Sequence, residues 1–122
     1  MSEGINIWEF RDTAGHTAGT DLIGFHVEAT DGHIGKVDRL SEHVDAQYLV
    51  VDTGPWIFGR LVLLPAGTVV RIELGERKVY VDRSKDEIRN SPPYDPGTPE
   101  TVPALRTPFA LYYSPFYGSR IP

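Results

Sequence analysis

Residues 24–82 of this 122-residue chain read GFHVEATDGHIGKVDRLSEHVDAQYLVVDTGPWIFGRLVLLPAGTVVRIELGERKVYVD. Short apolar runs alternate with charged residues, and glycine-marked turns stand between the runs. In the first run, Phe25, Val27 and Ala29 share one face, while the residues between them are polar. Alternation with a period of two is typical of a strand that is buried on one side. The stretch therefore predicts an all-β fold, a small closed barrel of about five to six antiparallel strands.

The first half of this barrel is expected to contain three strands. Asp31-Gly32 predicts a tight hairpin before a second strand over residues 34–40. Gly35 indicates a bulge in that strand, and its imperfect alternation indicates a further kink where the barrel turns. A third strand over residues 48–52 is apolar on both faces, so we expect it to be central or covered on its outside.

The second half is expected to contain a strand that ends at Pro65, then a hairpin and a helix. Apolar residues at alternate positions predict strands over residues 69–74 and 79–81. Ser84 and Glu87 have the spacing of a capping box, in which each side chain accepts a hydrogen bond from the other residue's amide. We expect a short helix from Ser84 to about Asn90, where prolines begin.

The two ends of the chain differ from the centre in composition. Residues 1–20 are predicted to form an N-terminal arm, either an extended segment covering the barrel or a helical turn. Residues 21–90 are the expected barrel domain with its helix. Eight of the ten prolines follow Asn90, so residues 91–122 are predicted to be extended or disordered. Five aromatics within residues 108–117 leave two alternatives open, a flexible tail and a segment that docks on the barrel or on a partner.

Length and composition exclude several classes of protein. A chain of this length has room for one domain, and the absence of cysteine removes disulfides and thiolate chemistry. A net charge of −5 with interleaved signs argues against nucleic acid as a partner. Apolar runs are too short for a membrane span, and no secretory signal is apparent. We therefore expect a cytoplasmic protein.

Candidate chemistry is sparse. The glycines of residues 32–36 have the wrong spacing for a phosphate-binding loop. His26 and His33 flank one hairpin, so their rings are expected to approach each other, but neither they nor His16 and His43 show the spacing of a metal site. The aspartates fall at strand ends and turns, without a pattern of paired catalytic carboxylates. We expect neither enzymatic activity, nor a metal, nor a cofactor.

Four short strings resemble one known family. DLIGFHV at 21–27, DGHIGKV at 31–37, YLVVD at 48–52 and LLPA at 63–66 are similar to the PRC-barrel family. That family includes the cytoplasmic part of the H subunit of photosynthetic reaction centres and the C-terminal part of a ribosome maturation factor. The resemblance covers residues 21–82, and the flanking residues look like those of stand-alone actinobacterial members, which have no assigned activity.

These observations favour a non-catalytic module for protein–protein interaction or assembly. The candidate partner-binding residues are aromatic or apolar, because such side chains dominate interface energies: Trp56, Ile57, Phe58, Tyr80 and Trp8. The alternative for the Trp-Ile-Phe triplet is that it plugs one end of the barrel. Self-association as a homodimer is one form of the interaction hypothesis. The resemblance also implies two other roles, a ribosome or RNA-processing assembly factor and a component associated with electron transfer or a photosynthetic complex.

Overall fold

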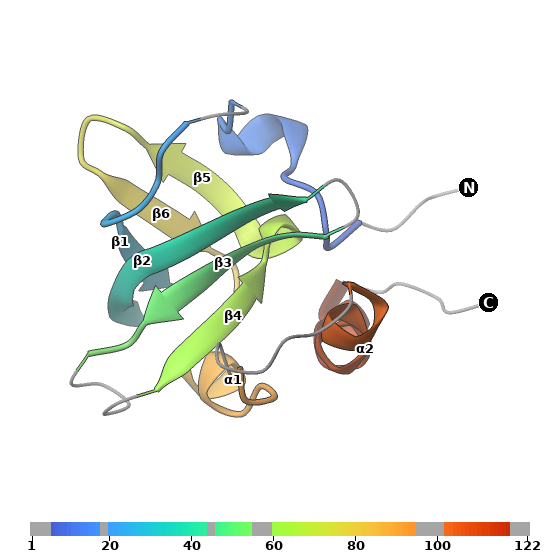
Figure 1. Ribbon diagram of the computed structural model, residues 1–122. Coiled ribbons are helices and arrows are strands. Elements are labelled where there is room, and N and C mark those ends of the chain that lie inside the picture. Colours follow the sequence, from blue (N-terminus) through green and yellow to red (C-terminus); the bar gives the residue numbers. More distant parts are fainter. Residues whose placement is uncertain (1–5, 18–19, 44–45, 55–59, 95–101, 118–122) are drawn as a thin grey trace.

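The computed structural model describes residues 6–17, 20–43, 46–54, 60–94 and 102–117. Six strands in this part of the chain form one curled sheet with the order β4-β3-β2-β1-β6-β5 (Figure 1). The strands are β1 (His26–Ala29), β2 (Gly32–His43), β3 (Ala46–Asp52), β4 (Leu61–Pro65), β5 (Val69–Glu73) and β6 (Lys78–Val81). The small β-barrel predicted from the alternating pattern is confirmed.

Five short helical elements accompany the sheet: η1 (Asp12–Ala14), η2 (Ala66–Thr68), α1 (Lys85–Arg89), α2 (Val102–Tyr113) and η3 (Ser114–Tyr117). The predicted capping box begins α1. The Glu87 amide donates to the Ser84 hydroxyl at 3.1 Å, and the Ser84 amide donates to the Glu87 carboxylate at 2.9 Å. Two otherwise unpaired amides at the start of the helix are thus satisfied.

Two irregularities bend β2, as its imperfect alternation indicated. Opposite β1, the register passes from Val27↔Gly35 to Glu28↔His33, so that one residue of β2 is unpaired. Opposite β3, a second shift follows Val37. Gly35 is required at the first bulge because a Cβ there would lie 2.1 Å from the carbonyl oxygen of Asp52. Such bulges increase the coiling of a sheet, which lets these few strands wrap around one core.

The expectation of wholly antiparallel pairing is wrong at one position, because β1 pairs with β6 in parallel. The reason lies in residues 65–69. The turn η2 is a corner that bends the chain between β4 and β5 without reversing it, and no ladder joins these two strands among the described residues (Figure 1). Strand β4 runs opposite to β1, and of the two connections from β4 to β6 only the hairpin after β5 reverses the chain. As a result, β6 runs in the direction of β1. The barrel is therefore open along the seam between β4 and β5.

The N-terminal arm packs across this seam. The Gly67 amide donates to the Ile7 carbonyl at 2.8 Å, and the Gln47 amide donates to the Trp8 carbonyl at 3.1 Å. A Cβ on Gly67 would lie 2.6 Å from the Ile7 Cα, so only glycine permits this close approach. The described part of the arm, residues 6–17, therefore packs on the barrel, and it contains the helical turn η1, which lies beside β5.

The expectation that residues 91–122 are extended or disordered is wrong over residues 102–117, hereafter the C-terminal segment. These residues form α2 and η3, and α2 lies beside β3 and β4 (Figure 1). Proline did not prevent the helix, because Pro103 falls in the first turn, where its missing amide proton has no partner to lose. Pro108 lies inside the helix but on its exposed side, while Phe109 and Tyr113 are buried. Burial of these two aromatics offsets the cost of the interior proline.

Candidate functional site

The outer faces of the barrel differ, and the face of β3 and β4 is already covered. Val50 and Leu63 are register partners on adjacent strands, and the alternation of side chains places both opposite the inward-facing Leu49 and Val51. Both are nevertheless fully buried. Tyr113, which is also fully buried, donates a hydrogen bond to the Leu63 carbonyl at 3.2 Å, so the C-terminal segment packs on β4. The helix α1 contacts β4 as well. The expectation that the 48–52 strand is central or covered on its outside is confirmed, because β3 lies between β2 and β4 and Val50 is buried.

The other end of the sheet carries an open groove. This groove has a volume of about 640 Å³ and is lined by residues of β1, β5, β6 and the β1–β2 turn, namely Glu28, Ala29, Thr30, Gly32, Val70, Arg71, Tyr80 and Val81. Ala29 and Val81 are buried and give it an apolar floor, and charged residues form its sides. We refer to it below as the open groove. Grooves with apolar floors and a few polar groups are the usual form of a binding site.

Tyr80 and Arg71 contact each other in the open groove. They are register partners on β6 and β5, and the Arg71 guanidinium carbon lies 4.2 Å from the centroid of the Tyr80 ring. Arg71 also forms an ion pair with Glu73 at 3.2 Å. The cation is attracted to the face of the ring, so this contact favours the observed orientation of Tyr80. The structure thus places one predicted site residue, Tyr80, on an accessible surface.

A pair of histidines lies next to the open groove. The ring centroids of His26 and His33 are 5.2 Å apart, which confirms the predicted approach across the hairpin. His33 contacts the Glu28 carboxylate through Nδ1 at 2.9 Å. Among the residues that the structure describes, no group of three histidine or acidic side chains is placed to hold a metal ion.

A second hollow lies beside the β2 bulge. It has a volume of about 310 Å³ and is lined by residues of β2 and the end of β3, namely His33, Ile34, Gly35, Lys36, Asp52, Thr53 and Gly54. The predicted Trp56, Ile57 and Phe58 follow Gly54 closely in sequence, but they lie outside the described residues. Trp8 is buried in the core, with 4% of its surface exposed, and meets Tyr48 edge-on at 6.5 Å. It packs against its own barrel instead of presenting a free anchor.

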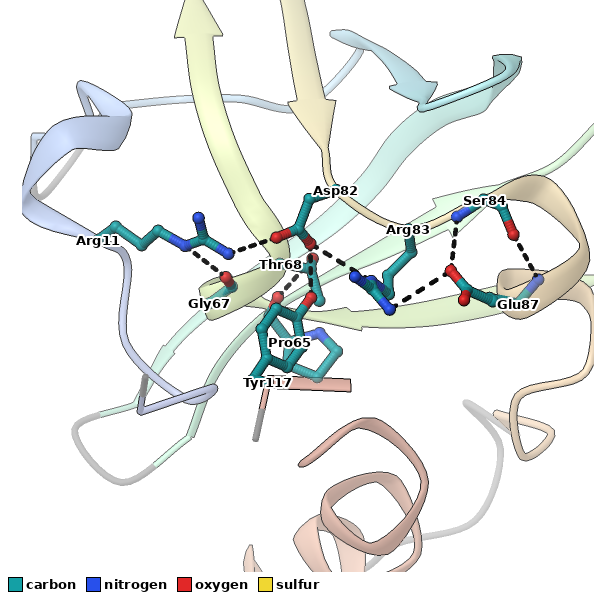
Figure 2. Close-up of polar contacts among 9 residues, drawn as sticks. All are labelled: Arg11, Pro65, Gly67, Thr68, Asp82, Arg83, Ser84, Glu87 and Tyr117. Atoms are coloured by element: carbon teal, nitrogen blue, oxygen red, sulfur yellow. Dashed lines mark hydrogen bonds and ion pairs between the residues drawn. The ribbon is translucent and has the colours of Figure 1, made fainter. Parts of the chain in front are cut away.

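A polar network joins the N-terminal arm, the end of β6 and the C-terminal segment (Figure 2). Asp82 is its centre. The Arg11 guanidinium donates to one Asp82 oxygen at 2.6 Å, and the Tyr117 hydroxyl donates to the other at 2.6 Å. Arg83 lies 3.5 Å from Asp82 and 3.4 Å from Glu87. The network therefore ties Arg11 of the N-terminal arm and Tyr117 of the C-terminal segment to the end of β6.

Three tyrosine hydroxyls of the C-terminal segment form hydrogen bonds with three different parts of the chain. Tyr112 donates to the Glu87 carbonyl of α1, Tyr113 to the Leu63 carbonyl of β4, and Tyr117 to Asp82. Burial raises the pKa of all three hydroxyls, and Asp82 raises the pKa of Tyr117 further. A raised pKa keeps the proton on the oxygen, so these tyrosines act as hydrogen-bond donors. The shifts oppose the tyrosinate that a nucleophile or general base would require.

The sequence had singled out neither Asp82 as a network centre nor Arg71 as the partner of Tyr80. Both depend on contacts between residues distant in the chain, such as Arg11 with Asp82. A signal for the C-terminal segment did exist, because Phe109 and Tyr113 are four residues apart and share one face of a helix.

Comparison with known families agrees with this architecture. The model of the PRC-barrel domain matches residues 15–88, which is more than half of the chain, so the chain belongs to the PRC-barrel family. Domains of this family are generally non-catalytic and serve in protein interaction and assembly. No curated protein matches the sequence. None of the helices in the described ranges is long and apolar enough to cross a membrane.

Proposed function

We propose that this chain is a non-catalytic protein-interaction module that receives an exposed segment of another polypeptide in its open groove. The observation that carries the proposal is the stacked pair of Tyr80 and Arg71 beside an apolar floor. Tyrosine and arginine are enriched among the residues that dominate binding energies. A side chain held in place before binding loses little entropy when the partner arrives.

The contrast between the two outer faces supports the location of this site. The apolar face of β3 and β4 is buried, with the C-terminal segment and α1 packed on β4. The face that carries Tyr80 is hollowed by the open groove. A groove that serves only as solvent-exposed surface has no need of an aromatic ring stacked and held in this way.

The apolar triplet of Trp56, Ile57 and Phe58 is proposed as a second contact region, as its composition indicates. It follows the hollow lined by Asp52 and Thr53 along the chain. The partner is a different polypeptide or, in a homodimer, a second copy of this chain.

The test is capture of partners from the native cell with matched charge reversals. Arg71→Glu alters the open groove, while Arg39→Glu is its control. Both arginines pair with an acidic neighbour, and their side chains are 55% and 52% exposed. A groove partner is retained by the wild type and by Arg39→Glu, and is lost with Arg71→Glu and with Tyr80→Ala. Its purified form should bind Tyr80→Ala at least about 30-fold more weakly. Equal retention by all variants would contradict the proposed site.

A further inference from the structure

We propose that the face formed by β3 and β4 is a binding site for an amphipathic helix of a partner protein, and that the C-terminal segment occupies it as a tethered stand-in. The partner helix carries an aromatic residue and, four positions later, a tyrosine. This site is separate from the open groove, and the inference does not depend on what the groove binds.

The edge of β4 offers such a helix a backbone acceptor that points away from the sheet. The Thr53 amide donates to the Arg60 carbonyl at 3.3 Å, so Arg60 directs its carbonyl toward β3. In an antiparallel pair this direction alternates from residue to residue, and Leu63, three positions later, therefore directs its carbonyl away from β3. The Tyr113 hydroxyl reaches that oxygen at 3.2 Å. The hydroxyl of a tyrosine on a helix thus takes the place of the amide donor that a further strand would supply.

The side chains around this acceptor form an apolar seat. Val50 and Leu63 are fully buried, although they point away from the barrel core. Phe109 is 3% exposed and Tyr113 is fully buried, and the two lie one helical turn apart. The seat therefore selects a helix with aromatic residues at positions i and i+4, which is a usual spacing for a helix in a groove.

Two further contacts hold the segment from outside the seat, and we call them the latch. The Tyr112 hydroxyl donates to the Glu87 carbonyl, and the Tyr117 hydroxyl donates to Asp82. Neither acceptor belongs to β3 or β4. Residues 95–101, DPGTPET, connect the segment to the rest of the chain. The latch can thus be weakened without any change to the seat.

The tethered segment competes with any free helix for the seat. A short tether gives it an effective concentration of roughly millimolar, so that only a small fraction of molecules have an empty seat. The apparent association constant for a free helix is the intrinsic constant multiplied by that small fraction. Each latch hydrogen bond raises the equilibrium constant for docking of the segment by about fivefold. Loss of both bonds should therefore strengthen binding of a free helix by roughly tenfold or more.

The experiment titrates full-length protein against a fluorescent peptide of residues 102–117, VPALRTPFALYYSPFY, and follows anisotropy. We expect the double variant Tyr112→Phe/Tyr117→Phe to bind the peptide roughly tenfold or more tightly than the wild type does. Leu111→Ser is the control, because Leu111 is 69% exposed on the outer side of the same helix. It should bind the peptide as the wild type does.

A second titration keeps the protein unchanged and tests the seat directly. A peptide carrying Phe109→Ala and Tyr113→Phe should bind wild-type protein at least about tenfold more weakly than the natural peptide. Equal binding of both peptides, or no binding to either protein, would overturn the proposal. Sedimentation decides between a partner helix and a second copy. If the latch variant dimerises at micromolar concentration, the preferred occupant is the segment of another copy, and the assignment of a different partner is wrong.

Discussion

Tyr113→Phe removes one oxygen atom from the buried contact between the C-terminal segment and β4. The Tyr113 hydroxyl donates to the Leu63 carbonyl at 3.2 Å, and both residues are fully buried. The substitution removes this hydrogen bond and a contact with the Ser91 side chain, and it leaves a buried carbonyl without its partner. Together these effects should lower the free energy of unfolding by about 2 kcal/mol at neutral pH.

The same residue makes the stability depend on alkaline pH. Burial raises the pKa of Tyr113 above its ordinary value of 10.0, so above pH 10 the unfolded chain loses this proton while the folded chain keeps it. The native state then binds more protons than the unfolded state, and stability falls as pH rises, by about 1.4 kcal/mol per pH unit for this group. The contribution is fully present below pH 10 and is absent from the variant.

Urea unfolding followed by circular dichroism at pH 8 and pH 11 measures both effects. The wild type should exceed Tyr113→Phe by about 2 kcal/mol at pH 8 and by less than about 1 kcal/mol at pH 11. Tyr80→Phe is the control, since the Tyr80 hydroxyl makes only a long contact of 3.4 Å with Glu76. A variant as stable as the wild type at pH 8, or a difference that stays constant up to pH 11, would refute the docked position of Tyr113.

Three further substitutions test the rest of the fold by the same unfolding measurement. Gly35→Ala should cost at least about 2 kcal/mol, because its Cβ would lie 2.1 Å from the Asp52 carbonyl oxygen; an unchanged midpoint would contradict the bulge. Ser84→Ala should cost about 1 kcal/mol by removing the cap on Glu87, and a neutral result would rule out the capping box. Trp8→Ala should cost about 3 to 5 kcal/mol, whereas a surface residue would cost far less.

The strands of the barrel were predictable because each is encoded locally. The alternation of Phe25, Val27 and Ala29 depends only on neighbouring residues, and so do the Asp31-Gly32 hairpin and the capping box at Ser84. The parallel pairing of β1 with β6 was not predictable in this way. It depends on the direction in which η2 turns the chain, and residues 66–68 read simply as a break between strands.

The C-terminal segment shows why composition misled the prediction. Proline predicts an extended chain on the assumption that the helix must supply its own stability. Here the stability comes from tertiary contacts, because Phe109 and Tyr113 are buried against the barrel. Tyr80 was predicted as a site residue from its apolar character, but its stacking on Arg71 follows from a shift in the β5–β6 register that no local pattern reveals.

Hydrogen exchange of the full-length chain, with and without its captured partner, tests the interaction surface most directly. If the open groove binds the partner, slowed exchange is expected in residues 28–32 and 69–81, which contain its lining. The strands β3 and β4, which contribute no residue to the groove, should exchange at the same rate in both states. If the partner slows exchange elsewhere in the chain but not in these two stretches, the groove is not the binding site.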